Sequence, residues 1–240
     1  MMRGTIATGW MLLLALAPIA RAQDAGYEEI QVDNEGTIVG RVHFEDDFPE
    51  AQKRTISIDL DTCGTRATSE RFVVDGDSKG LANAVLMIRD IPAGKPFAEV
   101  STTIQQLECR YSPHVAVMRS HQDLNIVNND PILHNVHAYR GKDSLFNLAQ
   151  PTKGTKTTRG MGDQGVVHLK CDVHPWMSGY ILLVNNPYVA ISGADGRFEI
   201  TGVPPGDYTL SLWHEALGIA TKPVTVGAGE SSEVDFPIGG

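Results

Sequence analysis

The stretch Val166-Val-His-Leu-Lys-Cys-Asp-Val-His-Pro-Trp-Met-Ser-Gly179 is the most informative part of this sequence. Its first half alternates apolar and polar residues, which is typical of a strand with one buried face, and Cys171 falls on that buried face. A short loop follows, in which His174 and Met177 come at spacings of three and Pro175 stiffens the chain. Cysteine, histidine and methionine side chains are therefore expected close together at the end of a strand.

A thiolate, an imidazole and a thioether on one tight loop are soft ligands of the kind that copper prefers. A type 1 copper site needs one Cys and two His in a plane, with a weak axial Met. One short loop cannot surround a metal, so the second histidine must come from another strand. The segment Pro131-Ile-Leu-His-Asn-Val-His-Ala138 offers His134 and His137. In a strand these two would face opposite sides, so only one of them can be a ligand.

These two segments resemble the ligand motifs of the cupredoxins, the plastocyanin-like blue copper proteins. The loop from Cys171 to Met177 has the Cys-x-x-His-Pro-aromatic-Met form of the short amicyanin-like loop. The segment around His134 is similar to the family's Pro-His-Asn-Val-His segment, with two residues inserted after the proline. The resemblance covers residues 104–184 and implies one type 1 copper ion, held by His134, Cys171, His174 and Met177.

The resemblance also implies a link between the two ligand loops. Asn135 matches the family residue that ties them together, and its partner would be Asp172, where a hydroxyl residue is more usual. Two alternatives to copper remain open: a zinc site of Cys and two His, and a metal-free arrangement in which Cys171 is half of a disulfide and Met177 is core. A thioether is a poor zinc ligand, which favours copper.

A second resemblance lies near the carboxyl end. Residues 189–210 contain Ala-Asp-Gly-Arg-Phe (194–198) and Val-Pro-Pro-Gly-Asp-Tyr-Thr-Leu (203–210). They resemble the carboxypeptidase regulatory-like module, a transthyretin-like (prealbumin-like) β-sandwich that is usually structural or ligand-binding. Residues 36–99 resemble the opening half of the same module.

Apolar residues at period two, separated by Asp-Gly, Pro-Ala-Gly and Pro-Pro-Gly turns, predict an all-β chain. Residues 56–60 are expected to form a strand, and a short helix is expected near 145–149. We predict a cupredoxin Greek-key β-sandwich, residues 100–186, inserted in or adjacent to a prealbumin-like β-sandwich made of 36–99 and 187–240. Two sequential domains are the alternative. Once copper takes Cys171, the remaining thiols, Cys63 and Cys109, are expected to form a disulfide that fastens the insert to its host.

The amino terminus predicts export. An apolar run, Trp10 to Ile19, precedes Ala20-Arg-Ala22, which is the layout of a signal peptide (residues 1–22) cleaved near Ala22-Gln23. A polar leader, residues 23–35, follows, and the expected location is periplasmic or secreted. The signal carries two arginines and no acid, so its removal takes the formal charge from −9 to −11. This charge argues against nucleic-acid binding, and no later segment is long and apolar enough to span a bilayer.

The expected function is one-electron transfer, because three strong ligands and an axial Met leave little room for substrate. The chain is not expected to be an enzyme, since it lacks the His-x-His pairs typical of a second copper site. Copper storage or delivery is one alternative, and a carbohydrate-binding or scaffold protein with a vestigial metal site is another. The expected partner is a redox protein with positive charge that docks on an apolar patch at Pro175 and Trp176, beside an exposed edge of His174.

The other histidines carry weaker signals. His137 is expected to be an ordinary half-buried strand residue, and His214 a hydrogen-bonded residue beside the packed Trp213. The sequence does not assign roles to His114 and His168, which could lie in an outer shell of the metal site.

Overall fold

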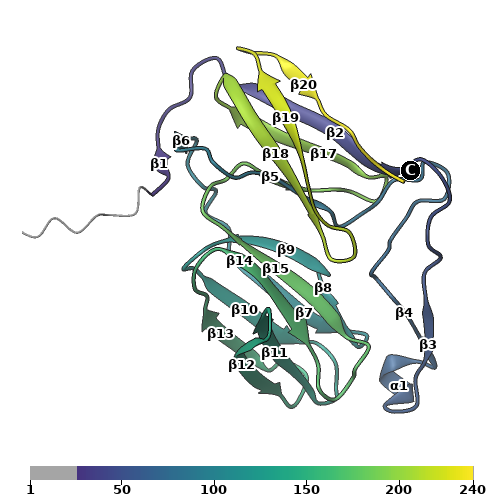
Figure 1. The fold of residues 1–240 in the computed structure, drawn as a ribbon. Coiled ribbons are helices and arrows are strands. Elements are labelled where there is room, and N and C mark those ends of the chain that lie inside the picture. The colour runs from purple at the N-terminus through teal and green to yellow at the C-terminus, as the bar shows by residue number, and fades with distance from the viewer. Residues whose placement is uncertain (1–25, 240) are drawn as a thin grey trace, which may run out of the picture.

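The computed structural model describes residues 26–239, and the predicted signal peptide lies outside the described residues. Two β-sandwiches lie one above the other in Figure 1, and a long arm runs down beside them. The described part of the chain is all-β apart from one short helix, α1 (Leu60–Cys63). It contains no helix long and apolar enough to cross a membrane.

The lower sandwich is built from two sheets that enclose one core. Its five-stranded sheet has the order β12-β11-β14-β15-β9, and its four-stranded sheet has the order β13-β10-β7-β8. The strands are β7 (Thr102–Leu107), β8 (Arg110–Ser112), β9 (Val115–Arg119), β10 (Asp123–Asn128), β11 (His134–Arg140), β12 (Asp143–Gln150), β13 (Lys156–Gly160), β14 (Gly165–Lys170) and β15 (Ser178–Val184). Alternate residues of both sheets, such as Leu124, Val167 and Ile181, are fully buried between them, as period-two patterning requires.

The upper sandwich combines strands from before and after the lower one. β2 pairs with β17, β20 and β21, and β5 pairs with β16 and β18, so residues 36–88 and 189–238 share both sheets and one core. Its strands are β2 (Gly36–Phe44), β5 (Val85–Ile88), β16 (Val189–Ile191), β17 (Arg197–Val203), β18 (Gly206–His214), β19 (Gly218–Val226), β20 (Ser231–Glu233) and β21 (Phe236–Ile238). At its edge, β1 (Glu28–Glu29), within the predicted leader, pairs with β6 (Ala93–Gly94).

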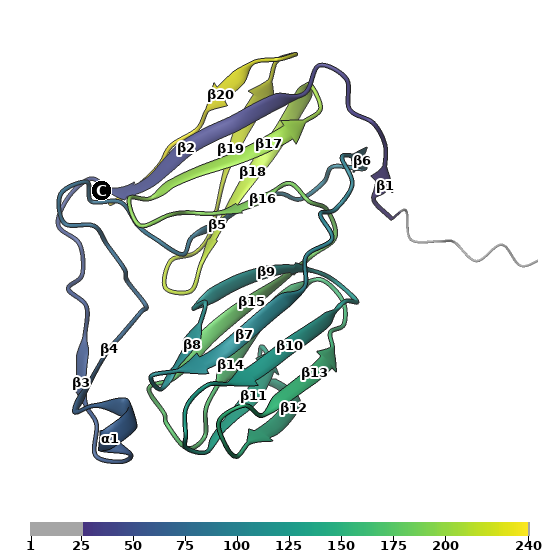
Figure 2. The ribbon, with the colours of Figure 1, turned by 180° about the vertical axis from the view of Figure 1, so that it is seen from behind.

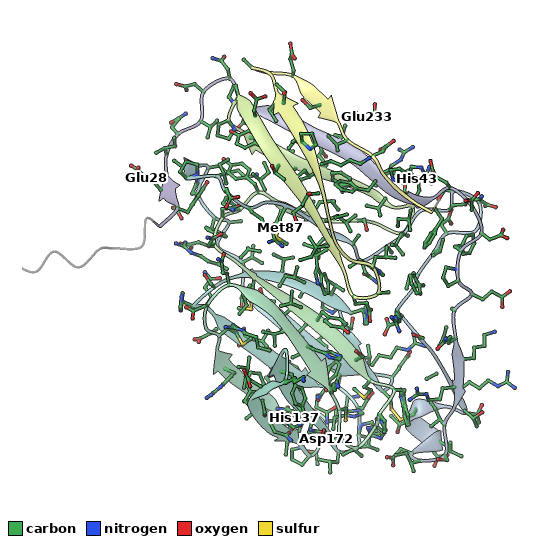
Figure 3. All side chains as sticks on the ribbon, in the orientation of Figure 1. Glu28, His43, Met87, His137, Asp172 and Glu233 are labelled. Atoms are coloured by element: carbon green, nitrogen blue, oxygen red, sulfur yellow. A yellow bond between two sulfur atoms is a disulfide. The ribbon has the colours of Figure 1, made fainter. Side chains whose placement is uncertain are left out.

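The two sandwiches pack through apolar residues on the outer faces of their sheets. Val85 and Trp213 of the upper sandwich meet Val115 and Leu182 of the lower one, and Figure 3 shows Met87 between the two. This second buried face explains why β15 reads Tyr-Ile-Leu-Leu-Val without polar alternation: both of its faces are covered.

The arm leaves the upper sandwich after β2 and reaches the far end of the lower one, as both ribbon views show (Figures 1 and 2). It consists of a two-stranded ribbon, β3 (Lys53–Thr55) and β4 (Arg66–Thr68), with α1 at its tip. Cys63 at the end of α1 forms a disulfide with Cys109, between β7 and β8 of the lower sandwich. The arm is therefore covalently fixed to a domain from which it does not originate.

Two expectations about local structure are wrong. Residues 145–149 are not a helix but part of β12, because β12 pairs with β11 on both sides of an irregularity at Leu145. The strand expected over 56–60 is not formed: only Ile56 is buried, while Ile58 and Leu60 are exposed and the chain turns into α1. Tertiary contacts override the local pattern at both places.

Candidate metal centre

Three of the four predicted ligands converge at one end of the lower sandwich. β11 and β14 are neighbours with His137 opposite Lys170, so His134 at the start of β11 and Cys171 just after β14 lie at the same edge. The Nδ1 atoms of His134 and His174 are 2.9 Å apart, and the Cys171 Sγ is 3.7 Å from the Nδ1 of His174. The three donor atoms lie within 4.8 Å of one another, and all three residues are buried.

An aspartate carboxylate holds each of the two histidine rings through its Nε2 atom. The Nε2 of His134 is 2.8 Å from Asp130 Oδ2, and the Nε2 of His174 is 2.9 Å from Asp59 Oδ2. A carboxylate only accepts hydrogen bonds and a neutral imidazole has one N–H, so each ring places its proton on Nε2. Both Nδ1 atoms then present lone pairs to each other and to the thiol.

Such a cluster of lone pairs fits a bound cation. Two nitrogen lone pairs 2.9 Å apart repel one another unless a positive charge lies against both. Burial lowers the pKa of His134, as does the neighbouring His174, while the bond to Asp130 opposes the change. The neutral imidazole, which is the metal-binding form, is therefore favoured. The donor set of two imidazoles and one thiol suits copper or zinc.

Met177 closes the ligand loop and is 2% exposed. Its N–H donates to the His174 carbonyl over 2.9 Å, and its carbonyl accepts from the Cys171 N–H over 3.4 Å. Met177 shares the apolar cluster that contains Cys171. The thioether is thus buried in the same loop as Cys171 and His174, where a fourth, axial ligand is expected.

Asn135 joins the two ligand segments in the structure. Its Oδ1 accepts from the backbone N–H of Asp172 over 2.7 Å and lies 3.3 Å from the Cys171 Sγ, and its Nδ2 donates to the Asp172 carboxylate over 2.9 Å. Partial burial raises the pKa of Asp172, but hydrogen bonds from Asn147, His137 and Asn135 outweigh it and hold the pKa below its usual value. The carboxylate therefore replaces the hydroxyl that the resemblance leads one to expect.

The expected exposure of His174 is wrong. Its side chain is 0% exposed, because Asp59 of the arm covers its Nε2 and the Cys63–Cys109 sulfurs lie within 4.8 Å of one of its ring nitrogens. Pro175 is exposed and Trp176 is partly exposed, with the Trp176 ring centroid 5.1 Å from that of His174. Trp176, not the His174 edge, therefore connects the cluster to the surface.

Asp59 provides a direct test of this arrangement. We expect Asp59→Ala to weaken metal binding at this cluster by about tenfold to a hundredfold, because the carboxylate orients the His174 ring and sets its tautomer. Asp61→Ala, in the first turn of α1 directly after Asp59, is the matched control, since the hydrogen bond to His174 comes from Asp59. Competition titration with a chelator measures both affinities. Equal affinities in the two variants would contradict the role given to Asp59.

His137 and His168 lie outside the cluster. His137 is half-buried and contacts the Asp172 carboxylate at 3.0 Å and Ser144 Oγ at 2.9 Å. Figure 3 shows His137 and Asp172 together at the lower end of the molecule. The His168 ring stacks on Tyr180 at 4.4 Å, and its Nε2 is 2.9 Å from Ser178 Oγ.

His114 and His214 belong to the contact between the sandwiches. The Nε2 of His114 is 2.5 Å from Glu215 Oε1. Burial lowers the pKa of His114, but the hydrogen bond to Glu215 and the charge of Glu70 outweigh it, so the pKa is raised. His214 is 1% exposed, and burial lowers its pKa to about 4. Neither histidine is close enough to join the three converging donors.

Two residues of this centre, Asp130 and Asp59, are not among the predicted site residues. Asp130 lies four residues before His134 in the turn Asn128-Asn-Asp-Pro131, and that spacing was the only available signal. Asp59 lies 115 residues from His174, and nothing in its own neighbourhood pointed to a metal.

A family model described as polysaccharide lyase family 4, domain II, matches residues 179–234. The carboxyl-terminal part of the chain thus matches this family model and not a carboxypeptidase regulatory-like one. The Asp-Gly and Pro-Pro-Gly turns behind the carboxypeptidase regulatory-like prediction reverse strands in many β-sandwiches and do not separate one family from another. No curated protein matches the chain.

Among solved structures, the chain is similar to copper proteins over part of its length. A purple cupredoxin from Nitrosopumilus maritimus shares 20% identity over 35% of this chain and 99% of its own, with a TM-score of 0.32. Amicyanin from Paracoccus versutus shares 19% identity over 41% of this chain and 96% of its own, with a TM-score of 0.32. A copper-containing nitrite reductase from Thermus scotoductus SA-01 shares 18% identity over 38% of this chain, with a TM-score of 0.33, and only 24% of its length is spanned. These likenesses concern the fold alone.

Proposed function

We propose that this protein binds one type 1 copper ion and carries single electrons outside the cytoplasm. The observation that supports this most directly is the meeting of His134 Nδ1, His174 Nδ1 and Cys171 Sγ within 4.8 Å, all buried and all with the metal-binding atom directed inward. Met177 in the same buried loop supplies the thioether that favours copper over zinc.

The protein's own groups would hold the site rigid. Asp130 and Asp59 fix the two imidazole rings, and Asn135 ties the segment of His134 to that of Cys171. Bound copper would cycle between two oxidation states. Packing and the hydrogen bonds from the ligands to neighbouring residues would keep the ligands in place in both states. This would lower the reorganisation energy of electron transfer.

The proposed partner is a redox protein that approaches at Trp176. The Trp176 ring packs against His174 and is partly exposed. The side chains beside it include Lys53, Arg54 and Arg110. The positively charged partner expected from the net charge of −11 of the mature chain therefore does not suit this part of the surface. Export fits the Cys63–Cys109 disulfide, which requires an oxidising compartment.

Copper titration of the mature chain tests the proposal. We expect one Cu²⁺ per chain and an intense visible absorption band from the copper–thiolate bond. The band should disappear on reduction and return on oxidation, with copper retained throughout. Zn²⁺ added at the same concentration is the control and should give no visible band. Copper binding without an intense band would overturn the type 1 site, and copper release on reduction would point to delivery instead of electron transfer.

A further inference from the structure

A cleft separate from the three converging donors lies where the arm, the loop of residues 171–177 and the upper sandwich meet. Its volume is about 300 Å³, and its lining comes from β3 and β4 with the residues that follow, from the segment around Trp176, and from Glu215 in the turn between β18 and β19. This space is large enough for one small ligand.

The lining is positively charged on a chain that is negative overall. Four cations, Lys53, Arg54, Arg71 and Arg110, face two carboxylates, Glu70 and Glu215, whereas the whole chain has a formal charge of −9. All four cations are exposed, and in the part of the chain that the structure describes none of them forms an ion pair. They are therefore available to a ligand.

The two carboxylates, Glu70 and Glu215, both contact His114, which also lines the cleft. Glu215 lies 2.5 Å from the Nε2 of His114, and Glu70 lies 3.7 Å from its Nδ1. The four cations outnumber these two carboxylates, so the cations are only partly neutralised from within. Like charges gathered around a concave space repel one another and concentrate a field there that attracts anions.

Three segments that are distant in sequence build this charge. Lys53 and Arg54 come from the arm before α1, Arg71 from the chain after β4, and Arg110 from the start of β8. The Cys63–Cys109 disulfide fixes the arm against the lower sandwich and so holds these side chains around one cleft. Arginine guanidinium groups match the oxygens of carboxylates and phosphates with paired hydrogen bonds, which lysine does not do.

We propose that this cleft binds a small multivalent oxyanion, a polycarboxylate or a phosphate, between Arg54, Arg71 and Arg110. The three arginines of this site do not belong to the donor set of the metal centre, so the proposal concerns the copper-free chain as well. Its position against Trp176 and Met177 places the bound anion next to the ligand loop of the metal centre.

Calorimetric titration of the copper-free mature chain with citrate and with inorganic phosphate tests the proposal, at constant ionic strength set with chloride. We expect saturable binding of one anion per chain, accompanied by a change in Trp176 fluorescence that Trp176→Phe abolishes. Arg54→Gln and Arg71→Gln should each weaken binding about tenfold or more, because each removes a charged hydrogen-bonding group. The tighter of the two anions identifies the ligand class.

Arg159→Gln is the matched control, since Arg159 is exposed on β13 and does not line the cleft. It should bind the anion as the unmodified chain does, and circular dichroism should show all variants folded. Equal binding in Arg54→Gln, Arg71→Gln and Arg159→Gln would overturn the proposal. So would a response to both anions that never saturates, which would instead describe a general positive surface for acidic proteins.

Discussion

The Cys171→Ser chain is expected to lose the intense visible absorption completely while keeping its fold. The band arises from charge transfer between thiolate and copper, and Cys171 is the one free cysteine in the described chain. Serine is close in size, so the core beside Val167 and Leu169 should remain packed. A hydroxyl is also a far harder ligand than a thiolate, so affinity for reduced copper should fall steeply. Absorption spectroscopy after copper addition measures the first effect, and chelator competition under reducing conditions measures the second.

Met177→Leu is the matched control for this substitution. It removes the thioether of the same loop with little change in volume and leaves the thiolate in place. The intense band should therefore persist in Met177→Leu, with an altered reduction potential, because the axial ligand tunes that potential. A band that survives in Cys171→Ser, or that disappears equally in both variants, would contradict the assignment of Cys171 as the copper thiolate.

Removal of the Cys63–Cys109 disulfide is expected to cause a larger loss of stability than any of the other substitutions described above. The Cys63–Cys109 bridge closes a loop with a sequence separation of 46, for which the chain-entropy model gives about 4 kcal/mol. The double variant Cys63→Ala, Cys109→Ala is preferable to a single one, because a lone thiol within 4.8 Å of His174 would add a new metal ligand. Urea unfolding of the copper-free protein measures the free energy of unfolding.

The same variant should also free the arm. Without the bridge, the main remaining bond between α1 and the metal centre is that of Asp59 to His174, and a single hydrogen bond to a partly exposed group contributes about 1 kcal/mol. Amide hydrogen exchange in β3, α1 and β4 should therefore become faster. Ser57→Ala, an exposed position on the arm with the disulfide intact, is the control. Unchanged stability and unchanged exchange in the double alanine variant would contradict the role of the bridge.

Much of the metal centre could be predicted from the sequence for a local reason. Cys171, His174 and Met177 lie within seven residues of one another, so the loop brings them together whatever the rest of the chain does. His134 could be added because a second histidine had to come from a neighbouring strand, and the pairing of β11 with β14 puts it there. Period-two patterning likewise predicted the sandwich strands, since alternation follows directly from a sheet with one buried face.

The arm, by contrast, was decided by tertiary structure. Its sequence around Ile56, Ile58 and Leu60 alternates as a strand would, yet the described chain turns there into α1, which is held by Cys109 of another domain. Asp59 belongs to the metal centre only through its contact with His174, which lies 115 residues away in the sequence. That contact buries the His174 edge that the short loop was expected to expose. Local patterns report which face of a segment is apolar, but not which distant segment will cover it. In this protein the sequence determined the donor atoms of the metal centre, and the packing of the arm determined that the His174 edge is buried.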